Sequence, residues 1–257
     1  MSTAIANSIE SRRQAVQAEI DAKKSAAERN RLGQFATPYE LAVDIARCVD
    51  SQITDRKMEI RFADPAIGSG SFFSAAHGVF GPKRIKSALG VELDNEFFDT
   101  ASALWTGEGL TMVRGDFTRL VSGGSPPPRP NVVLANPPYV RHHHLSREEK
   151  ERLQRIALEM TGVRVNGLAG LYVYFLLLAT AWMEEDGLAA WLVPSEFMDV
   201  NYGMALKQFL ADRVTLVRVH RFDPDEIQFG DALVSSVVLV FRKSAPPPGH
   251  SCEFTFG

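Results

Sequence analysis

The sequence predicts an α/β fold: a seven-stranded, mostly parallel, doubly wound sheet with an antiparallel last strand. From residue 59 onward, short apolar segments typical of strands alternate with helical segments, which favours a parallel sheet covered on both faces. The last two apolar segments, 215–220 and 233–241, follow each other without a helix between them, which predicts an antiparallel pair. The 257 residues, 45% of them hydrophobic, are enough for one large domain with a buried core.

The elements expected before the sheet are helical. Residues 1–31 are polar and rich in alanine, which predicts an N-terminal helical segment. The next helix is expected to begin with Thr37 as its N-cap, because Pro38 suits the first helical position and Glu40 stands three residues after the cap. Apolar residues then recur at helical spacing as far as Val49.

Strands and helices are expected to alternate after that helix. Strands are predicted at 59–64, 88–93, 110–116, 131–135, 188–193, 215–220 and 233–241. A further helix is predicted to begin within 69–78, and others are predicted at 94–105, 146–160, 171–185 and 200–212. Ser146 and Glu149 form a capping box at the start of one of them. The apolar run from Leu171 to Met183 is well below the roughly 20 residues that cross a bilayer, so it predicts a buried helix.

Charge and cysteine content narrow the class of protein. The net charge of -3 neither indicates nor excludes a nucleic-acid partner, because local patches decide such binding. Cys48 and Cys252 are far apart and have no metal-ligand spacing around them, which favours a reduced, cytoplasmic protein without a metal site. No apolar signal core opens the sequence, and no membrane partner is expected. The Pro-rich stretch at 245–248 predicts that 245–257 is a linker leaving the main domain, residues 32–244.

Polar residues follow the first three expected strands. In an open parallel sheet, ligands bind at the carboxyl ends of the strands near the topological switch point. The first strand ends in Asp64, ahead of Gly68 and Gly70, which allow a tight turn and close backbone approach. The second ends at Glu92, at the distance where an acid binds ribose hydroxyls, and the third at Asp116. Each residue alone also fits a plain turn or an exposed carboxylate, whereas together they predict a nucleoside site.

The fourth strand ends in Asn136-Pro137-Pro138-Tyr139, which is unusual chemistry for a strand end. The two prolines fix φ and remove both backbone donors after Asn136. The Asn136 side-chain oxygen and the Pro137 carbonyl can then accept the two hydrogens of an amino group, while Tyr139 can stack on a planar ring. This tetrapeptide therefore predicts a site that grips a planar group carrying an NH2.

These motifs resemble the S-adenosylmethionine-dependent DNA adenine-N6 methyltransferases of restriction–modification systems. The resemblance covers about residues 30–243, in the family's order: GQFATP (33–38), DPAIGSGSF (64–72), NPPY (136–139), LYVYF (171–175) and FGDALVSSVVLVF (229–241). It implies a class I, Rossmann-like methyltransferase fold in a bacterial or archaeal protein. It also implies S-adenosylmethionine as cofactor, double-stranded DNA as partner, and methyl transfer to a flipped-out adenine.

The resemblance also implies roles for individual residues. The implied cofactor-binding residues are Gln34, Phe35, Thr37, Pro38, Asp64, Pro65, Ala66, Gly68, Gly70, Glu92, Leu93, Asp116, Phe117, Asn136 and Phe175. The implied catalytic residues are Asn136, Pro137, Pro138 and Tyr139, and those for the base and DNA are Tyr139, Arg141 and Phe229. In this family a target-recognition domain follows the seventh strand. We therefore expect that domain, or a partner subunit, to read the DNA sequence, and the chain alone to methylate weakly.

Several alternatives stay open on the sequence. A methyltransferase with the same tetrapeptide could act on RNA or on a protein glutamine, because both present an NH2. A binding module without turnover and a dehydrogenase are the other candidates, although no Gly-x-Gly-x-x-Gly pattern supports the last. The basic stretch 141–155 fits contacts to DNA phosphates as well as it fits a solvated helix face with internal charge pairs. Three consecutive histidines, 142–144, are unsuited to converge on one metal ion.

Overall fold

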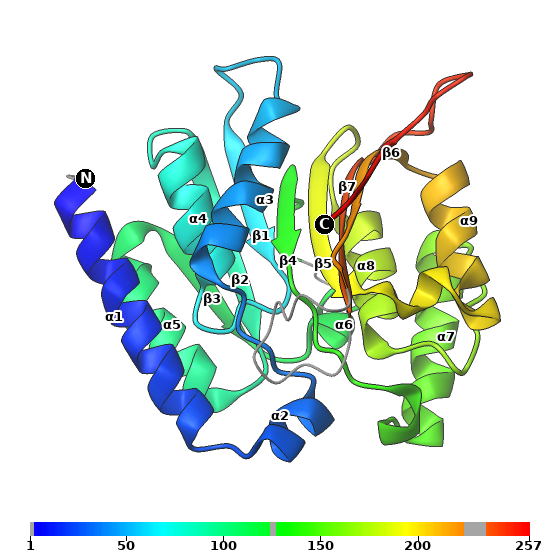
Figure 1. Ribbon diagram of the computed structural model, residues 1–257, viewed down its shortest axis with the longest axis horizontal. Coiled ribbons are helices and arrows are strands. Elements are labelled where there is room, and N and C mark those ends of the chain that lie inside the picture. The colour runs from blue at the N-terminus through cyan, green and yellow to red at the C-terminus, as the bar shows by residue number, and fades with distance from the viewer. Residues whose placement is uncertain (1–2, 124–126, 224–234) are drawn as a thin grey trace.

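The computed structural model describes residues 3–123, 127–223 and 235–257, and its centre is one mixed sheet (Figure 1). The described strands are β1 (Ile60–Asp64), β2 (Ile85–Glu92), β3 (Leu110–Arg114), β4 (Val132–Ala135), β5 (Leu188–Pro194), β6 (Thr215–Arg221), β7 (Ser236–Arg242) and β8 (Glu253–Phe256). The described helices of seven residues or more are α1 (Thr3–Ala22), α2 (Ala26–Leu32), α3 (Tyr39–Ser51), α4 (Ser71–Phe80), α5 (Asn95–Trp105), α7 (Arg147–Thr161), α8 (Leu171–Trp182) and α9 (Met204–Asp212). Helix α6 (Phe117–Leu120) is a single turn.

The strands lie in the order β3-β2-β1-β4-β5-β7-β6-β8. All paired strands are parallel except β7, which runs antiparallel to both β5 and β6. The predicted mostly parallel sheet with an antiparallel seventh strand is therefore confirmed. The chain leaves β1 for β2 and β3, then returns to β4 on the other side of β1. This reversal places a topological switch point at the carboxyl ends of β1 and β4.

The predicted strand number is wrong by one, because residues 253–256 extend the sheet. Strand β8 pairs in parallel with β6, from Arg218 opposite Glu253 to Arg221 opposite Phe256. An ion pair joins Arg218 to Glu253 across this pairing. The short segment alternates polar and aromatic residues, a pattern suited to an edge strand, and the Pro-rich stretch before it had favoured a linker for all of 245–257.

The sheet has a separate apolar core on each face, as alternation along its strands requires. In β4, Val132 and Leu134 pack in one core with residues of α3, α4 and α5. Val133 and Ala135 point the other way and pack with residues of α7, α8 and α9. The doubly wound arrangement is thereby confirmed. Helix α8 is the buried helix that the apolar run predicted, and no helix in the described part of the chain could span a bilayer.

The predicted N-terminal helical segment contains two helices, α1 and α2. Ser25 ends the connection between them with a capping box, in which Glu28 is the third residue of α2. Helix α1 runs along the outer side of the sheet at the left of Figure 1 and contacts α4 and α5. Helix α2 lies beyond the carboxyl ends of the strands, so this segment reaches the rim where a ligand is expected.

Candidate active site

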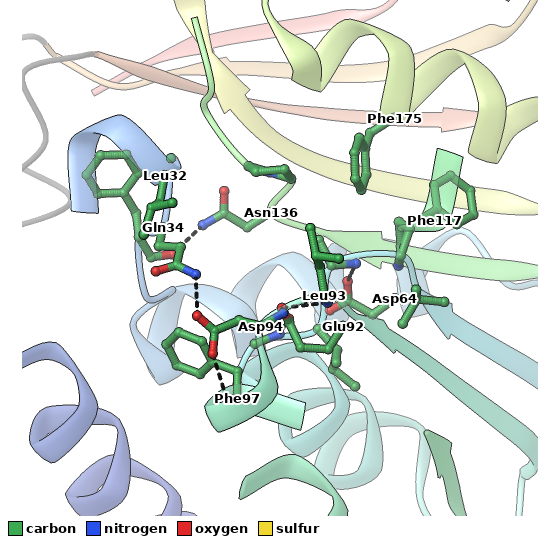
Figure 2. A pocket seen from close by; sticks show the side chains of 18 of the residues that line it. Leu32, Gln34, Asp64, Glu92, Leu93, Asp94, Phe97, Phe117, Asn136 and Phe175 are labelled. Carbon is green, nitrogen blue, oxygen red and sulfur yellow. Dashed lines mark hydrogen bonds between the residues drawn. The ribbon is translucent and has the colours of Figure 1, made fainter. Parts of the chain in front are cut away.

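A pocket of about 620 Å³ opens at the carboxyl ends of β1, β2, β3 and β4 (Figure 2). Most residues of the predicted site line it: Gln34, Phe35, Thr37, Asp64, Pro65, Ala66, Gly68, Glu92, Leu93, Asp116, Phe117, Asn136, Pro138 and Phe175. The predicted residues Pro38, Gly70, Pro137, Tyr139 and Arg141 are not in its lining. Phe229 lies outside the described residues. Segments spread over more than 140 residues of sequence are thus brought together in one cavity.

The Asn136 side chain is held in one orientation. Its amide nitrogen donates to the Phe35 carbonyl at 3.0 Å and to the Thr37 hydroxyl at 3.1 Å. Both amide hydrogens are therefore used inside the protein, and the side-chain oxygen remains as an acceptor in the pocket. Thr37 was expected to cap α3, but the N-cap residue is Pro38 and it makes no side-chain cap bond. The Thr37 hydroxyl fixes Asn136 instead.

The backbone of the NPPY turn is pinned against the segment after α2. The Tyr139 N–H donates to the Gly33 carbonyl at 3.0 Å. Gly33 has φ +66, and a Cβ added there would lie 2.3 Å from the Tyr139 nitrogen. Only glycine permits this approach. The motifs around residues 33–38 and 136–139 therefore form one unit, although about 100 residues separate them.

Tyr139 is held inside the protein. Its side chain is 5% exposed, and its hydroxyl donates to the Leu192 carbonyl at 3.1 Å. The ring centroid lies 5.4 Å from that of Phe35, at an interplanar angle of 46°. The predicted stacking of Tyr139 on a substrate base needs an accessible ring face, whereas in this arrangement the ring is buried beside Phe35.

Glu92 is prepared to accept a ligand hydroxyl. Its carboxylate accepts hydrogen bonds from the backbone N–H groups of Gly68 at 2.9 Å, Leu93 at 2.9 Å and Asp94 at 2.8 Å. A carboxylate has about four acceptor positions, so one remains for a ligand. Burial raises the pKa of Glu92, whereas these backbone donors oppose the rise. The three bonds fix the carboxylate before any ligand arrives.

Asp64 is the most deeply buried acid of the site. It is 2% exposed and accepts one hydrogen bond from the Ala66 N–H at 3.0 Å. Burial is the main reason that its pKa rises to about 8, and the nearby Glu92 adds to the rise. A neutral Asp64 is therefore the favoured form in the ligand-free protein at neutral pH.

We expect Asp64→Asn to stabilise the ligand-free protein at high pH. The unfolded chain ionises Asp64 near pH ~4, whereas the folded chain resists ionisation up to about pH 8. Stability from this group is thus complete below about pH 4 and is lost as the pH rises to about 8. Asparagine mimics the neutral form, so the variant should gain on the order of 5 kcal/mol at about pH 8. Thermal melts at several pH values test this, and a gain that does not grow with pH would contradict it.

Apolar side chains line the other end of the pocket. The ring centroids of Phe117 and Phe175 are 5.5 Å apart, on the far side from Gln34 in Figure 2. Leu93 is 69% exposed and faces the same cavity. Asp116 caps α6 by accepting from the Thr118 N–H at 2.8 Å. This end therefore offers flat apolar contacts and one carboxylate, a combination suited to a purine.

Sequence reasoning missed the part of the pocket that the N-terminal helices supply. Lys24 donates to the carboxylate of Asp94 at 2.9 Å and to the Gln34 side chain at 2.8 Å, and Gln34 donates to Asp94 at 3.2 Å. Lining residues that were not predicted include Arg13, Gln17, Asp21, Arg31, Ser69, Phe97 and His144. Arg13, Gln17 and Asp21 meet the strand ends only through the packing of α1, so no sequence motif marks them.

Comparisons with known proteins agree with the motifs. Residues 130–228 match a family model described as Eco57I restriction-modification methylase. Type II methyltransferase M.XamI of Xanthomonas campestris pv. amaranthicola is 27% identical over 219 residues, which are 82% of this chain and 39% of that protein. The chain spans about two fifths of the length of the curated relatives it matches.

Two solved structures show the same fold at low identity. A Listeria monocytogenes protein described as a class I S-adenosylmethionine-dependent methyltransferase superposes with a TM-score of 0.66 at 15% identity, over 85% of this chain and 65% of that one. A chain of the DrdV–DNA complex gives a TM-score of 0.68 at 18% identity, over 89% and 28%. The predicted resemblance to restriction–modification methyltransferases is confirmed, as is the class I methyltransferase fold.

Proposed function

We propose that this chain, which resembles the restriction–modification methyltransferases, is the catalytic part of a DNA methyltransferase. In this proposal it transfers the methyl group of S-adenosylmethionine to the N6 amino group of an adenine. The observation that carries it is Asn136 on the pocket lining, whose amide nitrogen is held by Phe35 and Thr37 so that its oxygen stays available as an acceptor. That oxygen is the acceptor an exocyclic amino group requires.

The pocket fits the proposed cofactor. A nucleoside with an amino acid side arm needs a hydroxyl acceptor, an apolar slot for the purine and a volume in the range of small-molecule sites. Glu92 supplies the acceptor, and Leu93, Phe117 and Phe175 supply the apolar slot. When bound, the cofactor supplies an electrophilic methyl group on a sulfonium.

The residues of the NPPY turn would activate the amino nitrogen. Its lone pair is delocalised into the purine ring, which makes it a poor nucleophile. Acceptance of its two hydrogens by the Asn136 oxygen and the Pro137 carbonyl favours a tetrahedral nitrogen with an exposed lone pair. No strong base is needed, because the proton becomes acidic once the methyl is attached. Positioning and electrostatic stabilisation therefore supply the catalysis.

The adenine must leave the double helix before it can reach this turn. Flipping a base costs a few kcal/mol, which stacking in the pocket partly offsets. Tyr139 and Phe229 remain the proposed stacking residues. Tyr139 lies directly after the prolines, but it is buried beside Phe35 without DNA. A target-recognition domain or partner subunit would select the DNA sequence.

Two measurements test the proposed function. Calorimetry should show that the chain binds S-adenosylmethionine and its demethylated product, S-adenosylhomocysteine. Mass spectrometry of DNA, RNA and protein incubated with the chain and cofactor should find N6-methyladenine in DNA. Methyl groups found on RNA or on glutamine instead would select the alternative substrates. The absence of cofactor binding would end the proposal altogether.

The predicted basic stretch divides into paired and unpaired cations. Most arginines on or beside α7 make ion pairs: Arg147 with Glu151, Arg152 with Glu149, and Arg155 with Glu159. Arg141 and Arg31 are exposed, and neither makes an ion pair among the residues that the structure describes. His144 lies on the pocket lining, and its pKa is lowered by desolvation, then by His143, Arg31 and Arg141. Arg31 and Arg141 are therefore the exposed cations available to contact DNA phosphates beside the pocket.

We expect Arg31→Gln and Arg141→Gln each to weaken DNA binding, because each substitution removes one phosphate contact. A contact of this kind contributes a slope of about 0.9 to the fall of log affinity with log salt. Each substitution should lower that slope by about 1 and reduce affinity at low salt. Arg141→Gln should do so without changing S-adenosylhomocysteine binding, because Arg141 is not in the pocket lining. Arg147→Gln is the matched control, because Arg147 is exposed but paired with Glu151. Fluorescence anisotropy with labelled duplex DNA measures this, and equal slopes in all variants would contradict it.

A further inference from the structure

Helix α1 forms one wall of the pocket through residues four positions apart. Arg13, Gln17 and Asp21 all line the cavity. This spacing places them on one face of the helix, about 6 Å of rise between neighbours. If α1 only packed on the outside of the domain, its polar residues would be expected to face solvent. This stripe faces inward.

Arg13 is buried with its charge balanced. It is 3% exposed, and its guanidinium donates to both carboxylate oxygens of Glu10, at 2.9 and 2.7 Å, and to the Ser69 hydroxyl at 2.9 Å. Glu10 also accepts from the Ser74 hydroxyl at 2.6 Å. Three of the five guanidinium N–H groups are thus used, which leaves two for a ligand. Burying such a pair costs several kcal/mol per ion, so its position at a cavity needs a reason.

Gln17 adds an acceptor beside Arg13. It is 9% exposed, and its amide nitrogen donates to Asp21 at 3.0 Å. No hydrogen bond to its side-chain oxygen occurs among the residues that the structure describes. The stripe therefore offers buried donors at Arg13 and, at Gln17, an acceptor that no described hydrogen bond uses. Together they complement a carboxylate next to an ammonium group.

The position of Arg13 selects the end of the ligand that it meets. Ser69, which Arg13 contacts, follows Gly68, whose N–H holds the ribose-binding candidate Glu92. The same loop continues to Ser71, whose hydroxyl donates to the Thr37 carbonyl at 2.9 Å, beside Asn136. The apolar purine slot around Phe117 lies on the other side of Glu92 from Gln34 (Figure 2). A ligand held at Glu92 therefore directs its amino acid arm toward α1.

We propose that Arg13 binds the carboxylate of the cofactor's amino acid arm and that Gln17 accepts from its ammonium group. The assignment rests on the proposed cofactor. It makes the N-terminal helix part of the methyl donor's binding site and a determinant of which adenosine derivatives bind. A purely structural Arg13, tying α1 to the glycine loop, would instead affect every adenosine ligand equally.

The test compares two ligands that differ in this arm. S-adenosylhomocysteine carries the full amino acid arm, whereas 5′-methylthioadenosine ends just after the sulfur. In Arg13→Gln we expect at least a tenfold loss of affinity for S-adenosylhomocysteine by calorimetry, in line with a lost hydrogen bond to a charged group. Affinity for 5′-methylthioadenosine should stay within about twofold. Arg12→Gln, the exposed neighbour on the same helix, should change neither affinity.

A second variant protects the test from misfolding. Arg13→Gln leaves Glu10 buried without its partner, which is costly. Glu10→Gln combined with Arg13→Gln removes both charges together, and it should show the same selective loss for S-adenosylhomocysteine. Equal losses for both ligands, or no loss for either, would overturn the proposal. If the unaltered protein bound neither ligand, the proposed function itself would fail.

Discussion

Asn136→Ala should reduce methyl transfer by about 10³-fold or more while leaving S-adenosylhomocysteine affinity within a few fold. The side-chain oxygen is the fixed acceptor of the pocket, because both amide hydrogens are held by Phe35 and Thr37. Removing one preorganised hydrogen-bonding group from a transition state typically costs about 10²–10³ in rate. Asn136 also positions the amino group itself, so the loss should lie at or beyond the upper end of that range. Single-turnover transfer of a labelled methyl group to duplex DNA measures it.

Two companion variants define what this loss means. Thr37→Val removes one of the two acceptors that orient the amide, so it should lower the rate by a smaller factor than Asn136→Ala. Asn201→Ala removes an exposed asparagine outside the pocket lining and should leave the rate unchanged. Full activity in Asn136→Ala would show that the acceptor role is misassigned. Loss of cofactor binding in that variant would show that Asn136 holds the cofactor and not the amino group to which the methyl is transferred.

The second large effect is expected at Gly33. A Cβ there would lie 2.3 Å from the Tyr139 nitrogen and 2.7 Å from the Val140 nitrogen. Backbone atoms cannot yield as a side chain can, so Gly33→Ala must push the NPPY turn away from its place. We expect a stability loss of about 3 kcal/mol from overpacking and the left-handed backbone. Displacing the turn by about 1 Å should lower methyl transfer by about 100-fold.

Gly162→Ala is the matched control for that variant. Gly33 and Gly162 both end helices in the left-handed conformation, with φ +66 and φ +72. A Cβ at Gly162 meets nothing within 4 Å. Its cost should therefore be the backbone term alone, about 1 kcal/mol, with unchanged transfer. Chemical denaturation and the same transfer assay compare the two variants. Equal effects at both positions would refute the steric link between Gly33 and the NPPY turn.

The fold and the centre of the site were accessible from local patterns in the sequence. Alternating strands and helices fixed the parallel sheet, and a parallel sheet brings consecutive strand ends to one rim. Asp64, Glu92 and Asn136 could therefore be grouped before any coordinates were known, and they line one pocket. Each lies within a few residues of a strand end, where neighbours in the sequence already report the environment.

The contributions that the sequence did not predict depend on packing between distant segments. Arg13 faces the pocket because α1 packs against α4 and α5, and nothing near residue 13 encodes that docking. Thr37 had the local pattern of an N-cap, but its hydroxyl is used by Asn136 across the pocket. Strand β8 was not predicted from the sequence, because its four residues follow a Pro-rich stretch and are too few for alternation to distinguish an edge strand from a linker.

The place of β7 in the sheet has a consequence for biosynthesis. It lies between β5 and β6 in space but follows both in the sequence, and its antiparallel pairing runs along all of β5. A nascent chain on the ribosome therefore carries β5, whose residues are all buried in the finished protein, with an open edge until about residue 242 has emerged. Such an edge invites pairing with other chains. Molecules cut short by a premature stop ahead of β7 are thus expected to aggregate and be degraded, even though every motif up to the NPPY turn has been translated.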